Sequence, residues 1–215
     1  MENRLESQSH RRVLLPGIQL VVVYAFIECA LWSPRMADRN RWALVAAITI
    51  LLAVILDRPS VRRMGLGLPV KSAGAVLAVS VAVGAGLTVL AIWLGGHFQS
   101  HTTLGYLYGS GGYLIWALLQ EFLLQSFFFT RCEEIFGTSG AVWAAATLFA
   151  AAHLPSPILT TFTLAGGLFF CELFRRYRSI LPIAIIHAAL GLIVGVTMPD
   201  SLLHHMRTGI GYLNY

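Results

Sequence analysis

The chain has 215 residues, of which 57 % are hydrophobic and only 12 % are charged, with a formal net charge of +5. A soluble domain usually carries about 25 % charged residues, so the composition argues against one and also excludes a disordered chain. Three scattered cysteines are too few for a disulfide-rich secreted scaffold. The arginines cluster in short groups between apolar stretches, which favours membrane topology over nucleic-acid binding. We therefore expect an all-α, polytopic integral membrane protein that contacts the lipid bilayer and no nucleic acid.

A bilayer core about 30 Å thick requires roughly 20 mostly apolar residues per spanning helix. About seven stretches of the chain qualify as transmembrane helices: 14–32, 42–56, 73–94, 113–130, 135–154, 158–174 and 180–197. We expect one membrane domain with three parts. Residues 1–112 hold an N-terminal tail and three spans, 113–197 form a core of four helices, and 198–215 form a C-terminal tail.

Three segments between these spans carry turn signals. The glycine-rich stretch 105–112 is predicted to be a loop, and Arg131 with Glu133 and Glu134 predicts a solvated loop. Pro155 and Pro157 mark a break, because proline cannot continue a helix interior.

The distribution of basic residues predicts the orientation. Eleven of the 15 arginines and lysines fall on the side that holds the N-terminus and the second–third, fourth–fifth and sixth–seventh loops. Because cytoplasmic loops carry the excess of basic residues, we expect a cytoplasmic N-terminus, in a bacterial inner membrane.

Ionisable residues inside apolar spans are costly, at least ~2.5–3.5 kcal/mol each at the bilayer centre, so they are informative. Glu28 lies near a span end, where it can reach lipid head groups. Glu172 precedes Arg175 and Arg176 by three and four residues, which predicts an ion pair on one helix face. Glu121, His153 and His187 have no such explanation.

These three residues fall at comparable depths in the fourth, fifth and seventh spans, so they can meet in one polar cavity. Gln125 shares a helix face with Glu121, and Phe149 shares one with His153. A carboxylate beside an imidazole can activate water while a second imidazole stabilises an oxyanion. One glutamate and two histidines can also bind zinc with an open position. Separate interhelical hydrogen bonds are the third possibility.

The order and spacing of these residues resemble the CPBP family of CAAX proteases and bacteriocin-processing intramembrane proteases, related to the prenyl-protein endopeptidase Rce-one. The family motif Glu-Glu-x-x-x-Arg corresponds to Gln120, Glu121 and Gln125, and Phe-x-x-x-His is intact as Phe149 and His153. The family motif His-x-x-x-Asn corresponds to His187 and Gly191.

Three family residues are replaced, which leaves two accounts open. The resemblance implies a glutamate that activates water with the first histidine, and an oxyanion hole made by the later histidine and asparagine. Here the first glutamate is Gln120, the arginine is Gln125 and the asparagine is Gly191. Gly191 also begins a Gly-x-x-x-Gly pattern, which is typical of close helix packing.

In the first account the chain is an intramembrane endopeptidase acting on a membrane-associated protein or peptide, including one that carries a lipid. Glu121 would activate water with His153, and His187 would hold the oxyanion. Gln120, Gln125, Phe149 and Gly191 would support the site or position the substrate. No cofactor is expected, and zinc at Glu121, His153 and His187 is the less favoured alternative. In the second account the chain is a catalytically inactive scaffold or helper. A proton-coupled carrier would show an internal repeat, which is not visible.

Overall fold

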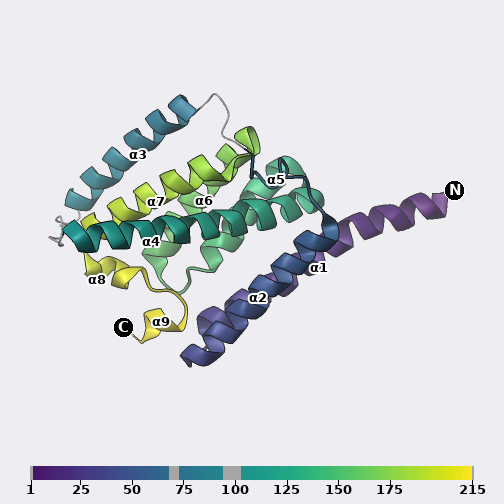
Figure 1. The fold of residues 1–215 in the computed structure, drawn as a ribbon, viewed down its shortest axis with the longest axis horizontal. Coiled ribbons are helices and arrows are strands. Elements are labelled where there is room, and N and C mark those ends of the chain that lie inside the picture. Colours follow the sequence, from purple (N-terminus) through teal and green to yellow (C-terminus); the bar gives the residue numbers. More distant parts are fainter. Residues whose placement is uncertain (1, 68–72, 94–102, 215) are drawn as a thin grey trace.

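A computed structural model describes residues 2–67, 73–93 and 103–214 (Figure 1). These residues contain helices and no strand, which confirms the all-α fold class. In chain order the elements are α1 (Glu2–Trp32), α2 (Met36–Asp57), α3 (Ala73–Trp93), α4 (Thr103–Glu121), the π-helix η1 (Phe122–Phe129), α5 (Thr130–Ala151), α6 (Pro157–Tyr177), α7 (Ile180–Thr197), α8 (Asp200–Leu203), the 3₁₀-helix η2 (His204–Met206) and α9 (Ile210–Leu213).

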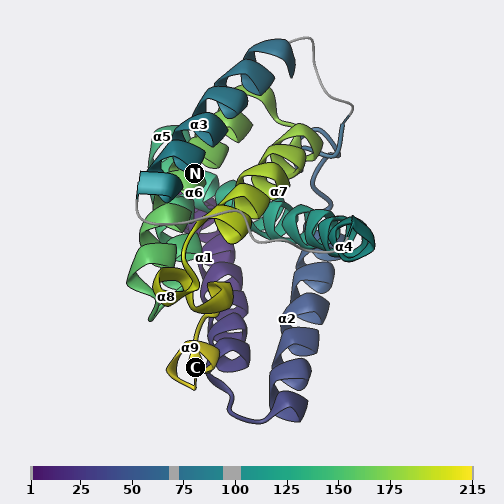
Figure 2. The same cartoon turned by 90° about the vertical axis from the view of Figure 1, so that its left-hand side faces the viewer.

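The long helices form a bundle with a helical hairpin along one side. Helices α1 and α2 lie side by side as an antiparallel pair, and the first turns of α1 extend beyond the rest of the molecule (Figures 1 and 2). Helix α7 packs against α4 on one side and against α3 on another, while α5 packs against α6. This arrangement places α4, α5, α6 and α7 around a common interior.

Helices occupy all seven stretches that the sequence predicts to span a membrane, although residue 94 lies outside the described residues. Within the described chain, five helices are long and apolar enough to cross a bilayer by length and composition. One of them, Gly111–Ala151, combines the fourth and fifth predicted spans, and the apolar part of α3 is the shorter helix Val81–Leu90. The structure therefore supports a helical membrane bundle.

Two loop predictions are wrong. The stretch 105–112 is helical and belongs to α4, so the expected domain boundary between residues 112 and 113 falls inside a helix. The segment 131–134 is helical as well, and the chain changes direction at Gly137, with φ 71° and ψ 173°. Glycine adopts this conformation without the steric penalty that a side chain would cause. The break at Pro155 and Pro157 is confirmed, with Pro157 as the first residue of α6.

The charged residues predicted to form a solvated loop instead make ion pairs between helices. Arg131 is only 3 % exposed and bonds Asp57, at the end of α2, at 2.6 Å. Its Nε donates to Gln19 of α1 at 3.0 Å. Glu133 pairs with Arg178, and Glu134 pairs with Arg63. These pairs join α1, α2, α5 and α6 at one end of the bundle.

The hydrophobic core lies beside these ion pairs and includes several buried phenylalanines. The Phe129 ring, from η1, packs edge-on against the Phe174 ring of α6 with centroids 5.3 Å apart. Gly167 of α6 allows close approach to α5, since an added Cβ would lie 3.2 Å from the Ala146 Cα atom. This packing holds η1, α5 and α6 in fixed register, on which the position of the polar residues depends.

Candidate functional site

Glu121 and His187 form a buried pair across the bundle. The Glu121 Oε1 atom lies 2.7 Å from Nδ1 of His187, although the two residues are 66 positions apart. Glu121 is fully buried at the end of α4, and the His187 side chain, on α7, is 12 % exposed. Because a carboxylate only accepts hydrogen bonds, Nδ1 carries the proton and donates it. The imidazole Nε2 atom is thereby left as an acceptor.

Gln125 provides the second partner of the Glu121 carboxylate. Its Nε2 atom donates to Glu121 Oε2 at 3.1 Å, as the predicted helix face requires. Gln125 lies in η1, which begins directly after Glu121. A π-helix is rare and is frequently found at functional sites. Its wider turn changes the direction in which the following side chains point. Gln120 is half-buried and makes no hydrogen bond to any described residue.

His153 lies in the turn after α5 and does not contact Glu121. Its Nδ1 atom is 2.7 Å from the Phe149 carbonyl oxygen, so the ring donates to the last turn of the helix. Burial lowers the pKa of the His153 imidazole below its ordinary value of 6.5, and the nearby His187 acts in the same direction. This histidine is therefore a neutral ring that caps a helix end.

The Phe149 ring connects the two histidines. Its centroid lies 4.8 Å from the His153 ring and 6.2 Å from the His187 ring. The His187 ring also stacks against the Phe170 ring of α6, with centroids 5.0 Å apart and an interplanar angle of 19°. The two aromatic rings and the Glu121 hydrogen bond fix the orientation of the His187 imidazole.

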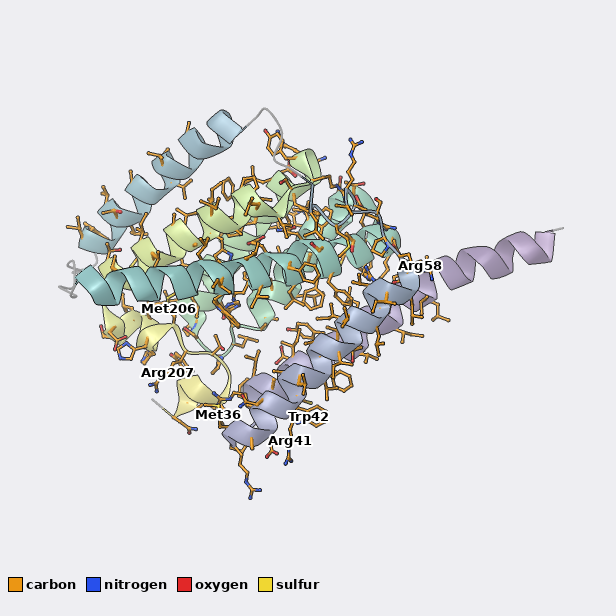
Figure 3. All side chains as sticks on the ribbon, in the orientation of Figure 1. Met36, Arg41, Trp42, Arg58, Met206 and Arg207 are labelled. Carbon is orange, nitrogen blue, oxygen red and sulfur yellow. The ribbon has the colours of Figure 1, made fainter. Side chains whose placement is uncertain are left out.

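A cavity of about 340 Å³ lies beside the His187 ring. Its lining is mostly apolar and aromatic and comes from α3, α4, α5, α6, α7 and the C-terminal segment. Thr163 also lines the cavity, but its hydroxyl donates to carbonyl groups of its own helix. Among the described lining residues, two polar side-chain groups make no hydrogen bond to a carbonyl group of their own helix. They are the His187 imidazole and the Tyr113 hydroxyl. Figure 3 shows Met206, which also lines the cavity, on the segment that follows α8.

Gly191 faces the same cavity one helical turn after His187. A Cβ atom at this position would lie 2.1 Å from the Tyr113 hydroxyl oxygen and 2.7 Å from the ring carbon that carries it. The Gly-x-x-x-Gly pattern predicted close packing between helices at this point. The neighbour of Gly191 is instead a side chain, and Gly195 faces Met206 at 3.6 Å.

The predicted site residues thus form a connected group in which only one acid–imidazole pair is in direct contact. Glu121, Gln125 and His187 are joined by hydrogen bonds, and Phe149 brings His153 close to them. Tyr113 was not singled out from the sequence, because its significance depends on Gly191 of another helix. Glu28 accepts a hydrogen bond from Trp32 at 3.0 Å, and Glu172 pairs with Arg175 and Arg176 as predicted.

The described residues contain no group of three histidine, cysteine, aspartate or glutamate side chains close enough to hold a metal ion. Glu121 and His187 bond each other, and the His153 Nδ1 atom bonds a backbone carbonyl. In this arrangement the Glu121 carboxylate and the Nδ1 atoms of both histidines are bonded to protein groups.

The fold and this pair define the class of protein: a helical membrane protein with a buried acid–imidazole pair beside an apolar cavity. The comparison with family models agrees with the resemblance seen in the sequence. Residues 103–193 match the family described as type II CAAX prenyl endopeptidase Rce1-like. The match runs from α4 into α7 and contains Glu121, His153 and His187. No curated protein and no solved structure matches the chain.

Proposed function

We propose that the protein is an intramembrane endopeptidase that hydrolyses a peptide bond of a membrane-associated protein or peptide. The observation that carries the proposal is the position of the His187 imidazole. Its Nδ1 atom is hydrogen-bonded to Glu121, and its ring lines the apolar cavity. The match of residues 103–193 to a protease family supports the same reaction class. A carboxylate and an imidazole kept from bulk water are suited to moving protons during hydrolysis.

The geometry supports His187 as the group that takes the proton from water. The water oxygen adds to the substrate carbonyl carbon as its proton passes to His187 Nε2, and the carbonyl oxygen becomes an oxyanion. The carbon–nitrogen bond then breaks, and Nε2 returns the proton to the leaving amine, which yields a carboxylic acid and an amine. Glu121 holds the ring and stabilises its positive charge, as the acid of a catalytic triad does.

These roles differ from those expected from the sequence, in which Glu121 acts with His153 and His187 binds the oxyanion. Glu121 is fully buried behind His187, and its carboxylate is bonded to His187 and Gln125. We assign His153 the role of a positioning residue, which holds the end of α5 and the Phe149 ring against the His187 imidazole. Gln120 is assigned no contact in the reaction.

The lining of the cavity suits a hydrophobic substrate. A ligand site is usually an apolar cavity with a few polar groups that fix orientation. At about 340 Å³ the cavity can accept an apolar side chain or part of a lipid group beside the cleaved bond. The proposed substrate is therefore a peptide with hydrophobic residues near its C-terminus, with a prenyl group as the lipid to test first, given the family.

We propose that the reaction requires no metal, since the acid and the imidazole are hydrogen-bonded to each other. A zinc ion held by all three residues would need the Glu121 carboxylate and a nitrogen of each ring at one point, and the described residues bring no such trio together. Activity that is unchanged by a chelator supports the metal-free reaction. Activity that is lost on chelation and restored by zinc alone contradicts it.

The experiment uses the full-length protein in lipid nanodiscs and a library of internally quenched peptides with hydrophobic C-termini. The library includes a prenylated peptide that ends in a CAAX sequence and the same peptide without the prenyl group. Cleavage by the wild type that falls in Glu121→Gln and His187→Gln supports the proposal. Failure of the wild type to cleave any of these peptides contradicts it and favours the inactive scaffold, which the replacements at Gln120, Gln125 and Gly191 would then explain.

A further inference from the structure

The Tyr113 side chain extends from α4 to the backbone of α7 at Gly191, a residue that lines the cavity. Its hydroxyl oxygen would be 2.1 Å from a Cβ at residue 191, so only glycine leaves room for it there. Both residues line the cavity that also contains the His187 ring. Glycine at position 191 and tyrosine at position 113 therefore form a complementary pair.

The hydroxyl lies close to the imidazole that the proposed reaction uses. Gly191 follows His187 by four residues, so the two positions lie on one face of α7, about 6 Å apart along the helix. The hydroxyl and the imidazole therefore face the same part of the cavity from one side of it.

The Tyr113 hydroxyl has no hydrogen-bond partner among the described residues, and the partly buried side chain lines the cavity. Tyrosine hydroxyls that leave water usually have a partner, because loss of hydration is costly. If only packing were required, phenylalanine would fill the same space without this cost. The hydroxyl is an O–H donor aimed at a cavity whose other described walls are mostly apolar.

We propose that Tyr113 is a further catalytic residue, whose hydroxyl donates a hydrogen bond to the oxyanion formed during peptide hydrolysis. This inference rests on the proposed function. A donor in a water-poor site stabilises an oxyanion more strongly than it does the neutral carbonyl, so it acts mainly on the transition state. Tyr113 thereby supplies from α4 a donor that the glycine at position 191 of α7 cannot supply.

The experiment compares Tyr113→Phe with the wild type, using the library peptide that the wild type cleaves best. Tyr24→Phe is the matched control, since its hydroxyl lies on α1 and Tyr24 does not line the cavity. Loss of one oxyanion donor typically lowers kcat by about 10²–10³-fold, and we expect this loss in Tyr113→Phe with KM unchanged. A peptide phosphonamidate, which mimics the tetrahedral intermediate, should bind Tyr113→Phe more weakly by a similar factor.

A second variant tests the position of the hydroxyl rather than its presence. Gly191→Ala keeps the phenol but displaces its hydroxyl, and it should lower kcat in the same range. The inference is overturned if Tyr113→Phe retains kcat within about threefold of the wild type, or if only KM changes. Such a result leaves the proposed function intact, provided that Glu121→Gln abolishes cleavage. An inactive wild type, in contrast, overturns the proposed function and this inference together.

Discussion

The Glu121 carboxylate of α4 and the His187 imidazole of α7 lie 2.7 Å apart. This contact joins two helices that the chain separates by 66 residues, and it satisfies an acid that is fully buried. A buried carboxylate without a partner would be very costly in a membrane. The pair therefore stabilises the packing of α4 on α7 and orients the imidazole toward the cavity. Both effects predict consequences for variants.

The fit between Gly191 and Tyr113 predicts a coupled effect on stability. Gly191→Ala places a Cβ 2.1 Å from the tyrosine hydroxyl, and this overpacking should destabilise the protein by about 1–3 kcal/mol. Tyr113→Ala should relieve the clash, so the double variant should be more stable than the sum of the single effects indicates. Thermal unfolding in detergent measures the effect. Gly86→Ala is the control, since nothing lies within 4 Å of its Cβ position.

The buried Arg131 predicts a large loss of stability on truncation. Arg131→Ala leaves Asp57 without its 2.6 Å partner and removes a side chain that is only 3 % exposed. Removing one member of a buried pair typically costs about 3–5 kcal/mol, with the lower end expected here because Asp57 is partly exposed. Chemical unfolding of the purified protein measures the difference.

Arg41→Ala serves as the matched control for the Arg131 prediction. Its pair with Asp38 is 3.4 Å long and the Arg41 side chain is 79 % exposed, so the variant should unfold as the wild type does. Equal stability of Arg131→Ala and Arg41→Ala would show that the network between α1, α2 and α5 does not stabilise the bundle.

The lowered pKa of His153 predicts a pH-dependent stability. An unfolded histidine titrates near pH 6.5, whereas the buried ring stays neutral to lower pH, so below pH 6.5 the unfolded state binds more protons. Stability should therefore fall as the pH decreases from about 7 to 5. His153→Gln should reduce this dependence in thermal unfolding at several pH values. An unchanged pH dependence in the variant would contradict the neutral, buried state of the ring.

The bundle also predicts which residues face opposite sides of the membrane. Figure 3 shows Arg41 and Arg58 at opposite ends of α2. We expect the Arg58 end to be cytoplasmic, since most basic residues fall on that side. In a cysteine-free background, a membrane-impermeant thiol reagent added to intact cells should label Arg41→Cys but not Arg58→Cys. The reverse labelling pattern would refute the expected orientation.

The sequence predicted the helices better than their ends. Apolar length alone identifies a spanning helix, because a bilayer requires internal hydrogen bonds and a fixed length. The sequence predicts the turn near Glu133, whereas the structure has it at Gly137. Charged residues such as Glu133 indicate a loop unless their partners, here Arg178, are known. Those partners lie far away in the chain, so local sequence could not reveal them. Gly137 provides the backbone freedom that the turn requires.

For the site, residue spacing predicted the Glu121–Gln125 contact but not which histidine meets the acid. The sequence places His153 and His187 at similar depth in the membrane. In the structure His153 lies in the turn after α5 and bonds the Phe149 carbonyl, whereas His187 lies within α7 and bonds Glu121. The place where α5 ends does not follow from apolar periodicity. Tyr113 was missed because its meaning depends on Gly191 of another helix.

The most direct test of the central claim is the cleavage rate of Glu121→Gln and His187→Gln relative to His153→Gln in nanodiscs. If the Glu121–His187 pair carries the proton, the first two variants should lose about 10²–10⁴-fold in kcat. His153→Gln, which acts through Phe149, should lose about tenfold or less with an unchanged pH–rate profile. Loss of activity in His153→Gln alone, with Glu121→Gln and His187→Gln active at the wild-type rate, would contradict the account.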